Sequence, residues 1–374
     1  MNGRAALRVL LFVLLTGLLL SGCGQTAGSD TPDDPVEEQE RTDISAEMPE
    51  RQAEAIAVTI GETSYSVPAF NYYYFSALND IIQNAGSTAS FLNLDPAKDL
   101  SEQDCPLSED GGSWDDYLRS AVLDHLKDVT ALGTAAANEG VSLSKGQEYE
   151  IDQQMEYLAL QASDTGYEGL TACLEAQYGS GMSEELMRDI LTKQRLCEVY
   201  KAHVQAQYEF SDDELAGYYR DHLYEYSAYS WLYAFAGNND RPETAEICGE
   251  LAAIHDKQTF TDRCIDLTGR EVYTMTDVSG QELGDPEAPD AVWLSDPNRA
   301  EGDTFTGDTG SSSYVLYYLS RNDYGFEEDE DSSSSEWRVK AFKGLRDQTF
   351  DQWLETAVAG LEIAGGEGWE SVGR

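Results

Sequence analysis

The chain has 374 residues, with 70 acidic and only 24 basic side chains, so its formal net charge at pH 7 is −46. A surface this negative repels polyanions and argues against nucleic acid as a partner. Hydrophobic residues make up 41% of the chain and include 22 tyrosines, which excludes a disordered protein and provides enough apolar material for about two domains.

The first residues have the pattern of an export signal. Arg4 and Arg8 precede an apolar stretch from Val9 to Leu20, which is shorter than the ~20 apolar residues needed to cross a bilayer core. The run Leu-Ser-Gly-Cys at 20–23 follows at once and resembles the lipobox of bacterial lipoproteins.

This resemblance implies that residues 1–22 are a lipoprotein signal peptide, cleaved between Gly22 and Cys23, and that the Cys23 thiol is lipidated. Stable membrane attachment needs two or more acyl chains, which a lipidated cysteine supplies. The protein is then expected outside the cytoplasm, anchored to the outer face of the cytoplasmic membrane. Residues 23–53, rich in Pro, Asp, Glu and Ser, predict an acidic flexible linker. An uncleaved anchor is the alternative.

A helical domain is expected at 54–225. It opens with a strand at 56–60, a turn at Gly61 and a second strand at 65–67. From Val67 apolar residues recur at helical spacing, and Gly86 can end that helix. Further helices are predicted at 114–138, 145–162, 170–178, 184–208 and from 212. Capping boxes begin at Ser144 and Ser211, and Ser183 caps another helix.

The next region, 226–324, predicts an α+β sheet with helices packed against it. Strands are expected at 228–236, 271–275 and 314–319, and helices at 242–254, 259–267 and 291–294. An acidic linker at 327–335 leads to a last helix within 335–360. The glycine-rich end, 360–374, is expected to be loose.

This order of parts resembles the SurA/PrsA family of extracytoplasmic foldases, and the run SDDELAGYYRDHLYEY from Ser211 is the most telling local match. The resemblance implies an α+β protein with an all-helical chaperone domain at 54–225. A parvulin-like peptidyl-prolyl isomerase domain at 226–324 is inserted, and a C-terminal helix at 335–360 returns to the helical domain. Its partners would be unfolded or partly folded exported proteins.

The parvulin-like part lacks the histidines that active members carry in the first and last strands. The matching stretches here are 229–233 (YSWLY) and 313–317 (SYVLY), and the four histidines, His125, His203, His222 and His255, fall at predicted helical positions. Prolyl isomerisation crosses a barrier of ~18–20 kcal/mol and needs a polarising, low-dielectric pocket. We therefore predict no catalytic residues and a weak or inactive isomerase.

Client binding needs an adaptable apolar surface, and tyrosine combines a large contact area with a polar tip. The alternative for each such ring is a place in the core. The candidate client-binding residues are Tyr73, Tyr74, Tyr218, Tyr219, Trp231, Tyr233 and Trp293.

No metal site or cofactor is predicted. Cys105, Cys173, Cys197, Cys248 and Cys264 show no zinc-ligand spacing; Cys248 and Cys264 could pair if their helices abut, which the sequence alone does not establish. The acidic run 323–331 lacks EF-hand spacing. Two alternative functions stay open: an active isomerase that uses other polar groups, and a non-chaperone surface lipoprotein such as a solute receptor or scaffold.

Overall fold

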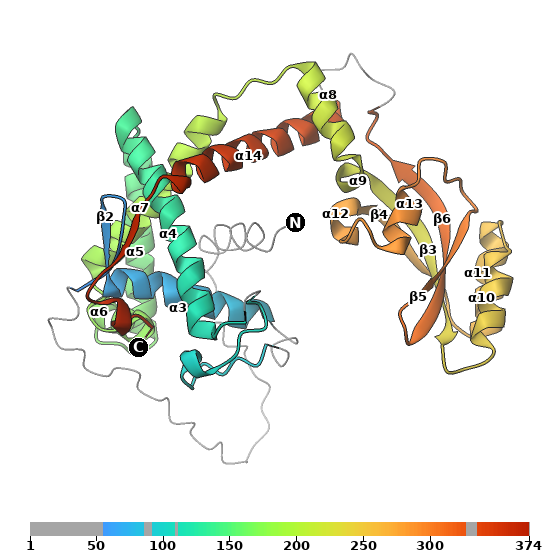
Figure 1. The fold of residues 1–374 in the computed structure, drawn as a ribbon, viewed down its shortest axis with the longest axis horizontal. Helices are drawn as coiled ribbons and strands as arrows, with labels where there is room; N and C mark the ends of the chain where they lie inside the picture. Colours follow the sequence, from blue (N-terminus) through green and yellow to red (C-terminus); the bar gives the residue numbers. More distant parts are fainter. Residues whose placement is uncertain (1–54, 86–91, 109–110, 327–334, 374) are drawn as a thin grey trace. The chain divides into compact units, whose positions relative to one another are not determined.

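The computed structural model describes residues 55–85, 92–108, 111–326 and 335–373 (Figure 1). The predicted signal peptide 1–22, the cleavage site at Gly22 and Cys23, and the linker 23–53 lie outside these residues. The described chain is α+β, with two small antiparallel sheets. It divides into two compact units: unit 1 runs to Gln207 and resumes at Phe350, and unit 2 is Tyr208–Thr349.

Unit 1 is mainly helical. Its elements are β1 (Ile56–Ile60), β2 (Thr63–Ser66), α3 (Val67–Ala85), η3 (Leu100–Glu102), α4 (Trp114–Glu139), α5 (Lys145–Asp164), α6 (Leu170–Tyr178), α7 (Glu184–Gln205), the second half of α14 (Glu336–Ala359), β7 (Ile363–Gly365) and η4 (Trp369–Ser371). The expected β-hairpin and helices are confirmed. Ser144 and Ser211 form the predicted capping boxes, and Ser113 forms a further one: each hydroxyl accepts from the third residue of its helix, whose side chain accepts from the serine N–H.

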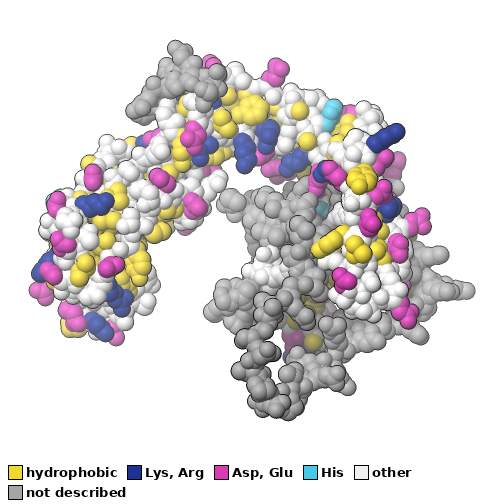
Figure 2. Space-filling view, turned by 180° about the vertical axis from the view of Figure 1, so that it is seen from behind, with side chains coloured by type: hydrophobic (Ala, Val, Ile, Leu, Met, Phe, Trp, Pro, Cys, Tyr) yellow, Lys and Arg dark blue, Asp and Glu magenta, His cyan; other side chains and the backbone are white. Residues whose placement is uncertain are grey.

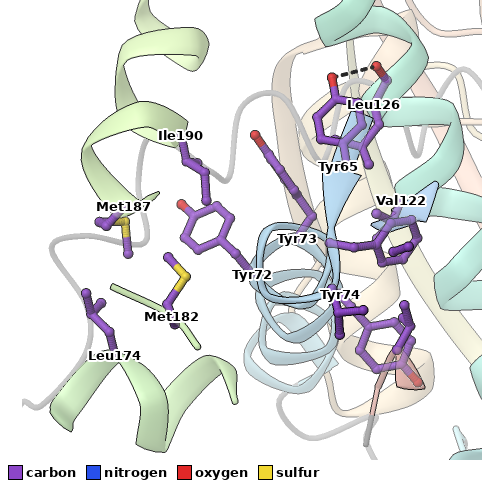
Figure 3. Close-up of a cluster of buried hydrophobic side chains, with 14 of the residues drawn as sticks. Tyr65, Tyr72, Tyr73, Tyr74, Val122, Leu126, Leu174, Met182, Met187 and Ile190 are labelled. Atoms are coloured by element: carbon purple, nitrogen blue, oxygen red, sulfur yellow. Dashed lines mark hydrogen bonds between the residues drawn. The ribbon is translucent and has the colours of Figure 1, made fainter. Parts of the chain in front are cut away.

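Helix α3 is buried on more than the single face that its apolar spacing predicts. Successive helical residues point about 100° apart, yet Tyr72, Tyr73 and Tyr74 are all at most 3% exposed. Figure 3 shows Tyr72 and Tyr74 leaving α3 on different sides, Tyr72 toward Met187. The Tyr74 hydroxyl donates to Asp115 at 2.8 Å. The helix is thus the centre of the unit 1 core.

The C-terminal end is ordered, so the expectation of a loose segment at 360–374 is wrong for the described part. β7 pairs antiparallel with β1, and the Arg119 guanidinium donates to the carbonyls of Trp369 and Val372 at 2.7 and 2.8 Å. A Cβ on Gly366 would lie 2.0 Å from the carbonyl oxygen of Ile56. This glycine therefore permits close backbone approach, and its presence does not indicate flexibility.

Unit 2 contains the larger sheet. Its elements are α8 (Asp212–Asp221), α9 (Leu223–Tyr226), β3 (Ala228–Asn238), α10 (Thr244–Ala252), α11 (Lys257–Thr268), β4 (Tyr273–Ser279), α12 (Gly280–Leu283), α13 (Pro289–Ser295), β5 (Thr304–Asp308), β6 (Ser312–Asn322) and the first half of α14. The strand order is β4-β3-β6-β5. β5, α9 and α12 are additions to the predicted elements; β5 (TFTGD) is short and carries glycine and aspartate, which gives a weak strand signal.

Helix α8 groups with unit 2 because it packs against the start of α14. Tyr219 is fully buried beside Trp337, with ring centroids 5.7 Å apart, and Ala341 completes the cluster. The Arg338 guanidinium pairs with Asp212 at the start of α8. The last expected helix is confirmed as α14.

The cysteines and histidines depart from two expectations. All five described cysteines are free and buried, so Cys248 and Cys264 do not pair although both thiols lie in the core beneath α10 and α11. His222 lies in the turn between α8 and α9, and His255 lies in the loop between α10 and α11. The helical positions predicted for these two histidines are therefore wrong.

Candidate peptide-binding surface

The sheet of unit 2 has two unlike faces. One face carries small and aliphatic residues such as Leu232, Ala234 and Val315 and is covered by α10 and α11. Figure 1 shows these two helices on one side of the sheet, with α12 and α13 on the other. The second face is rich in aromatic residues. They lie together there because alternate residues of a strand point to the same side of the sheet.

Helix α13 covers only part of the aromatic face. Its Trp293 and Leu294 pack on Trp231, Leu316 and Tyr318. The Trp293 ring lies 5.5 Å from Phe305 and 6.0 Å from Tyr318, centroid to centroid. The covered part is therefore a satisfied core, closed by its own aromatic contacts.

The remaining part of this face is open. We call it the aromatic shelf: Tyr233, Tyr273, Met275 and Tyr314. Tyr273 is 65% exposed and Met275 38% exposed, while Tyr233 and Tyr314 are half-buried. The Tyr233 and Tyr314 rings stack at 5.0 Å, and the Tyr273 ring lies 6.3 Å from that of Tyr233. The shelf thus offers connected aromatic surface to a ligand.

The position of the shelf is set by the contacts of Tyr314. A Cβ on Gly307 would lie 2.1 Å from the ring of Tyr314, so the absent side chain makes room for that ring. The Tyr314 hydroxyl donates to Asp290 at 3.5 Å. These contacts, with the stack on Tyr233, hold the Tyr314 ring in place, whereas Tyr273 is mostly exposed.

The shelf reaches the edge of the sheet. β4 is the terminal strand and pairs only with β3 in the described sheet. Residues 273–277 of this strand are all exposed. A terminal strand presents unpaired backbone N–H and C=O groups, which an extended peptide can pair with. Backbone pairing and an adjacent apolar surface are therefore offered together.

No group on the shelf is suited to act as a base at neutral pH. Burial raises the pKa of Tyr233 and raises that of Tyr314 to about 12. Both hydroxyls stay protonated and can donate hydrogen bonds. The stretches 229–233 and 313–317, which lack histidine, lie on the paired strands β3 and β6. The chemistry available here is apolar contact and hydrogen bonding.

The described histidines of unit 2 lie elsewhere in contacts of their own. The His222 ring stacks on Tyr218 with centroids 4.1 Å apart. Nδ1 of His255 bonds the carbonyl of Gly302 at 2.8 Å. Each ring is engaged in packing or in a backbone hydrogen bond.

The structure separates the predicted client-binding residues into two groups. Tyr73, Tyr74 and Tyr219 are buried, and Trp231 and Trp293 are at most 9% exposed, so these five rings fill cores. Tyr218 and Tyr233 are half-buried. Tyr233 lies on the shelf, whereas Tyr218 packs near α14, where a Cβ on Gly344 would lie 2.7 Å from its ring.

Three shelf residues were not among the predicted ones: Tyr273, Met275 and Tyr314. The signal for Tyr273 and Met275 is the alternation Tyr-Thr-Met-Thr at 273–276, which marks one face of a strand. Alternation gives a face, but the position of α13 decides which part of that face stays open.

The surface of the described chain is mixed in charge. Figure 2 shows acidic side chains scattered over the visible face, with apolar and basic side chains among them. No group of acidic, histidine and cysteine residues arranged to hold a metal ion occurs in the described ranges. None of the helices described there combines the length and apolarity required to span a membrane.

Among the comparisons with known proteins, matches come from solved structures. No family model matches the sequence, and no curated protein matches it. Among solved structures, the chain is similar to one from a study of PEB4 and Cj1289, two structurally related SurA-like chaperones of Campylobacter jejuni, at 11% identity. The match covers 83% of this chain and 98% of that chain with a TM-score of 0.28, a value at which the likeness carries no argument.

Proposed function

We propose that the protein is a membrane-anchored extracytoplasmic chaperone that binds unfolded exported polypeptides. The observation that carries this proposal is the aromatic shelf, where Tyr273 and Met275 are exposed beside the stacked rings of Tyr233 and Tyr314. Exposed, contiguous apolar surface on a soluble domain marks an interaction site. A surface that runs along the edge of a sheet fits an extended chain better than a compact solute.

Two physical terms support binding of an extended chain at this place. An incoming strand can pair with the free edge of β4, and this backbone pairing does not depend on the client's sequence. Its apolar side chains can at the same time cover Tyr273 and Met275. Tyrosine suits varied clients because it gives a large contact area at low entropic cost.

The anchor and the domain assignment belong to the same proposal. Lipidation of Cys23 would hold the protein at the outer face of the cytoplasmic membrane, after removal of residues 1–22. The linker 23–53 would then carry a chaperone domain at 54–225, a parvulin-like domain at 226–324 and a returning helix at 335–360. The basis is the sequence pattern at 20–23 and the order of the parts.

The parvulin-like domain is proposed to bind clients with little or no isomerase activity. Rotation of a prolyl amide needs a site that favours the twisted state over the ground state. The shelf offers phenols with raised pKa values and no imidazole. Exchange of a proline peptide, measured by NMR, is expected to run at the uncatalysed rate with the protein present; acceleration typical of an active parvulin would instead support the isomerase alternative.

The chaperone proposal is tested by light scattering of a chemically denatured client diluted into buffer. The purified full-length protein is expected to suppress aggregation at stoichiometric ratios. The Tyr273→Ala/Met275→Ala double variant should lose most of that effect while it keeps the parent's circular dichroism. Undiminished aggregation with the parent protein, together with saturable binding of a small solute, would favour the receptor alternative.

A further inference from the structure

A second candidate site lies in unit 2, at the end of β3 beside the helix layer. It is a cavity of about 170 Å³ whose lining includes Phe235, Arg241, Glu243, Ile247, Leu267 and Arg270. Ile247 and Leu267 also pack on the core beneath α10 and α11. The cavity therefore adjoins the helix-covered layer, and its lining includes none of the four residues of the aromatic shelf.

The two arginines of this cavity are unusual in so acidic a protein. Most arginines in the described ranges form an ion pair with a carboxylate, as Arg263 does with Glu250. Within those ranges Arg220, Arg241 and Arg270 are the exceptions. Two of these three arginines, Arg241 and Arg270, are exposed residues of one cavity lining. Their positive charge is available to a ligand.

A ring contact positions the Arg270 side chain at the cavity, and backbone hydrogen bonds position the Arg241 backbone there. The Arg270 guanidinium lies 4.5 Å above the Phe235 ring. Arg241 precedes α10, and its carbonyl accepts from the Thr244 N–H at 3.2 Å, while the Thr244 hydroxyl donates to Asn238 at 2.8 Å. This tight loop places Arg241 at the N-terminus of a helix, whose dipole also favours an anion.

We propose that this cavity binds the C-terminal carboxylate of a polypeptide that ends in an apolar residue. Guanidinium groups bind carboxylates with paired, charge-assisted hydrogen bonds, and Phe235, Ile247 and Leu267 supply an apolar wall for the last side chain. The volume lies below the ~300–1,000 Å³ typical of pockets for small-molecule ligands. It suits one terminal residue.

The charges around the cavity favour a singly charged group. Glu243 is an exposed carboxylate on the same lining. It offsets one of the two guanidinium charges and so disfavours a dianion such as phosphate. The opposite charges predict opposite effects: neutralising Glu243 strengthens binding of the carboxylate, whereas neutralising either arginine weakens it.

The site extends beyond the proposed chaperone function, because it does not use the shelf. The test is calorimetric titration of the full-length protein with an N-acetylated hexapeptide ending in leucine, with either a free or an amidated C-terminus, and with inorganic phosphate. The free acid is expected to bind at least about tenfold more tightly than the amide, as expected for charge-assisted hydrogen bonds. Equal affinity for acid and amide, or tighter binding of phosphate, would overturn the proposal.

The variants identify the side chains. Arg241→Gln and Arg270→Gln should each weaken binding of the free acid about tenfold, and Glu243→Gln should strengthen it a few-fold. Arg220→Gln removes the third unpaired arginine, which does not line the cavity, and should change nothing. Tyr273→Ala should also leave this binding intact. If Arg220→Gln weakened binding of the free acid equally, the effect would reflect net charge alone and the assignment of the site to this cavity would be refuted.

Discussion

Replacing Tyr273 with alanine separates the role of the shelf in binding from its role in the fold. The Tyr273 ring is 65% exposed and lies on the terminal strand β4. Among the described residues, its ring contact is with Tyr233, with centroids 6.3 Å apart. A surface substitution of this kind changes the free energy of unfolding by about 0.5 kcal/mol or less. Any large loss of binding then reports contact with the peptide.

The size of that loss follows from the area that remains uncovered. A fully buried tyrosine removes about 150–250 Å² from water, and 65% of the Tyr273 ring is still exposed. A peptide that covers about half of the remainder hides roughly 50–80 Å². At about 25 cal/mol per Å² this contributes about 1–2 kcal/mol. The dissociation constant should rise about five- to thirtyfold.

The assay is fluorescence anisotropy of a labelled, extended apolar peptide titrated with the full-length protein. Tyr149→Ala is the matched control, because Tyr149 is 61% exposed on α5 in unit 1. The control is expected to bind like the parent. If Tyr273→Ala also binds like the parent, or if both variants weaken binding equally, the shelf is not the binding surface.

Three further predictions use other parts of the chain. Gly307→Ala should displace the Tyr314 ring, because the new Cβ would lie 2.1 Å from it; thermal unfolding should show a loss of about 1–3 kcal/mol, and an unchanged melting temperature would contradict the packing. Cys23→Ser should move the protein from the membrane to the soluble fraction after cell fractionation, and persistent membrane association would contradict lipidation. Burial raises the pKa of Asp80 to about 6. The contribution of Asp80 to the free energy of unfolding is therefore most favourable below about pH 4 and is lost as pH rises through 6. Asp80→Asn should therefore raise the free energy of unfolding at pH 7.5 by about 1–2 kcal/mol after solvent screening, with little difference from the parent at pH 4, as measured by urea unfolding. The same difference between variant and parent at both pH values would refute this.

Much of the fold follows from local signals. Ser144 and Ser211 announce the starts of α5 and α8, because a capping box depends only on residues three apart. Likewise, the apolar period from Val67 correctly gives the first turn of α3. Such features need no knowledge of the rest of the chain.

Features set by distant neighbours could not be predicted in this way. Whether α3 buries one face or all its faces depends on the elements around it, and so Tyr73 and Tyr74 became core residues. Gly366 indicates flexibility by composition, yet it is fixed by its approach to Ile56. In both cases the deciding partner lies far away in the sequence.

The candidate site illustrates the same limit more sharply. Trp231 and Tyr233 occupy the same face of β3, two residues apart, and carry the same sequence signal. Trp231 is buried because α13 places Trp293 and Leu294 near it, whereas Tyr233 borders the uncovered part. A strand pattern can identify an aromatic face, but only the extent of its cover divides that face into core and binding surface. The extent of the binding surface should therefore depend on how well α13 packs. A variant that weakens the packing of Trp293 would expose more of the aromatic face and lower the free energy of unfolding.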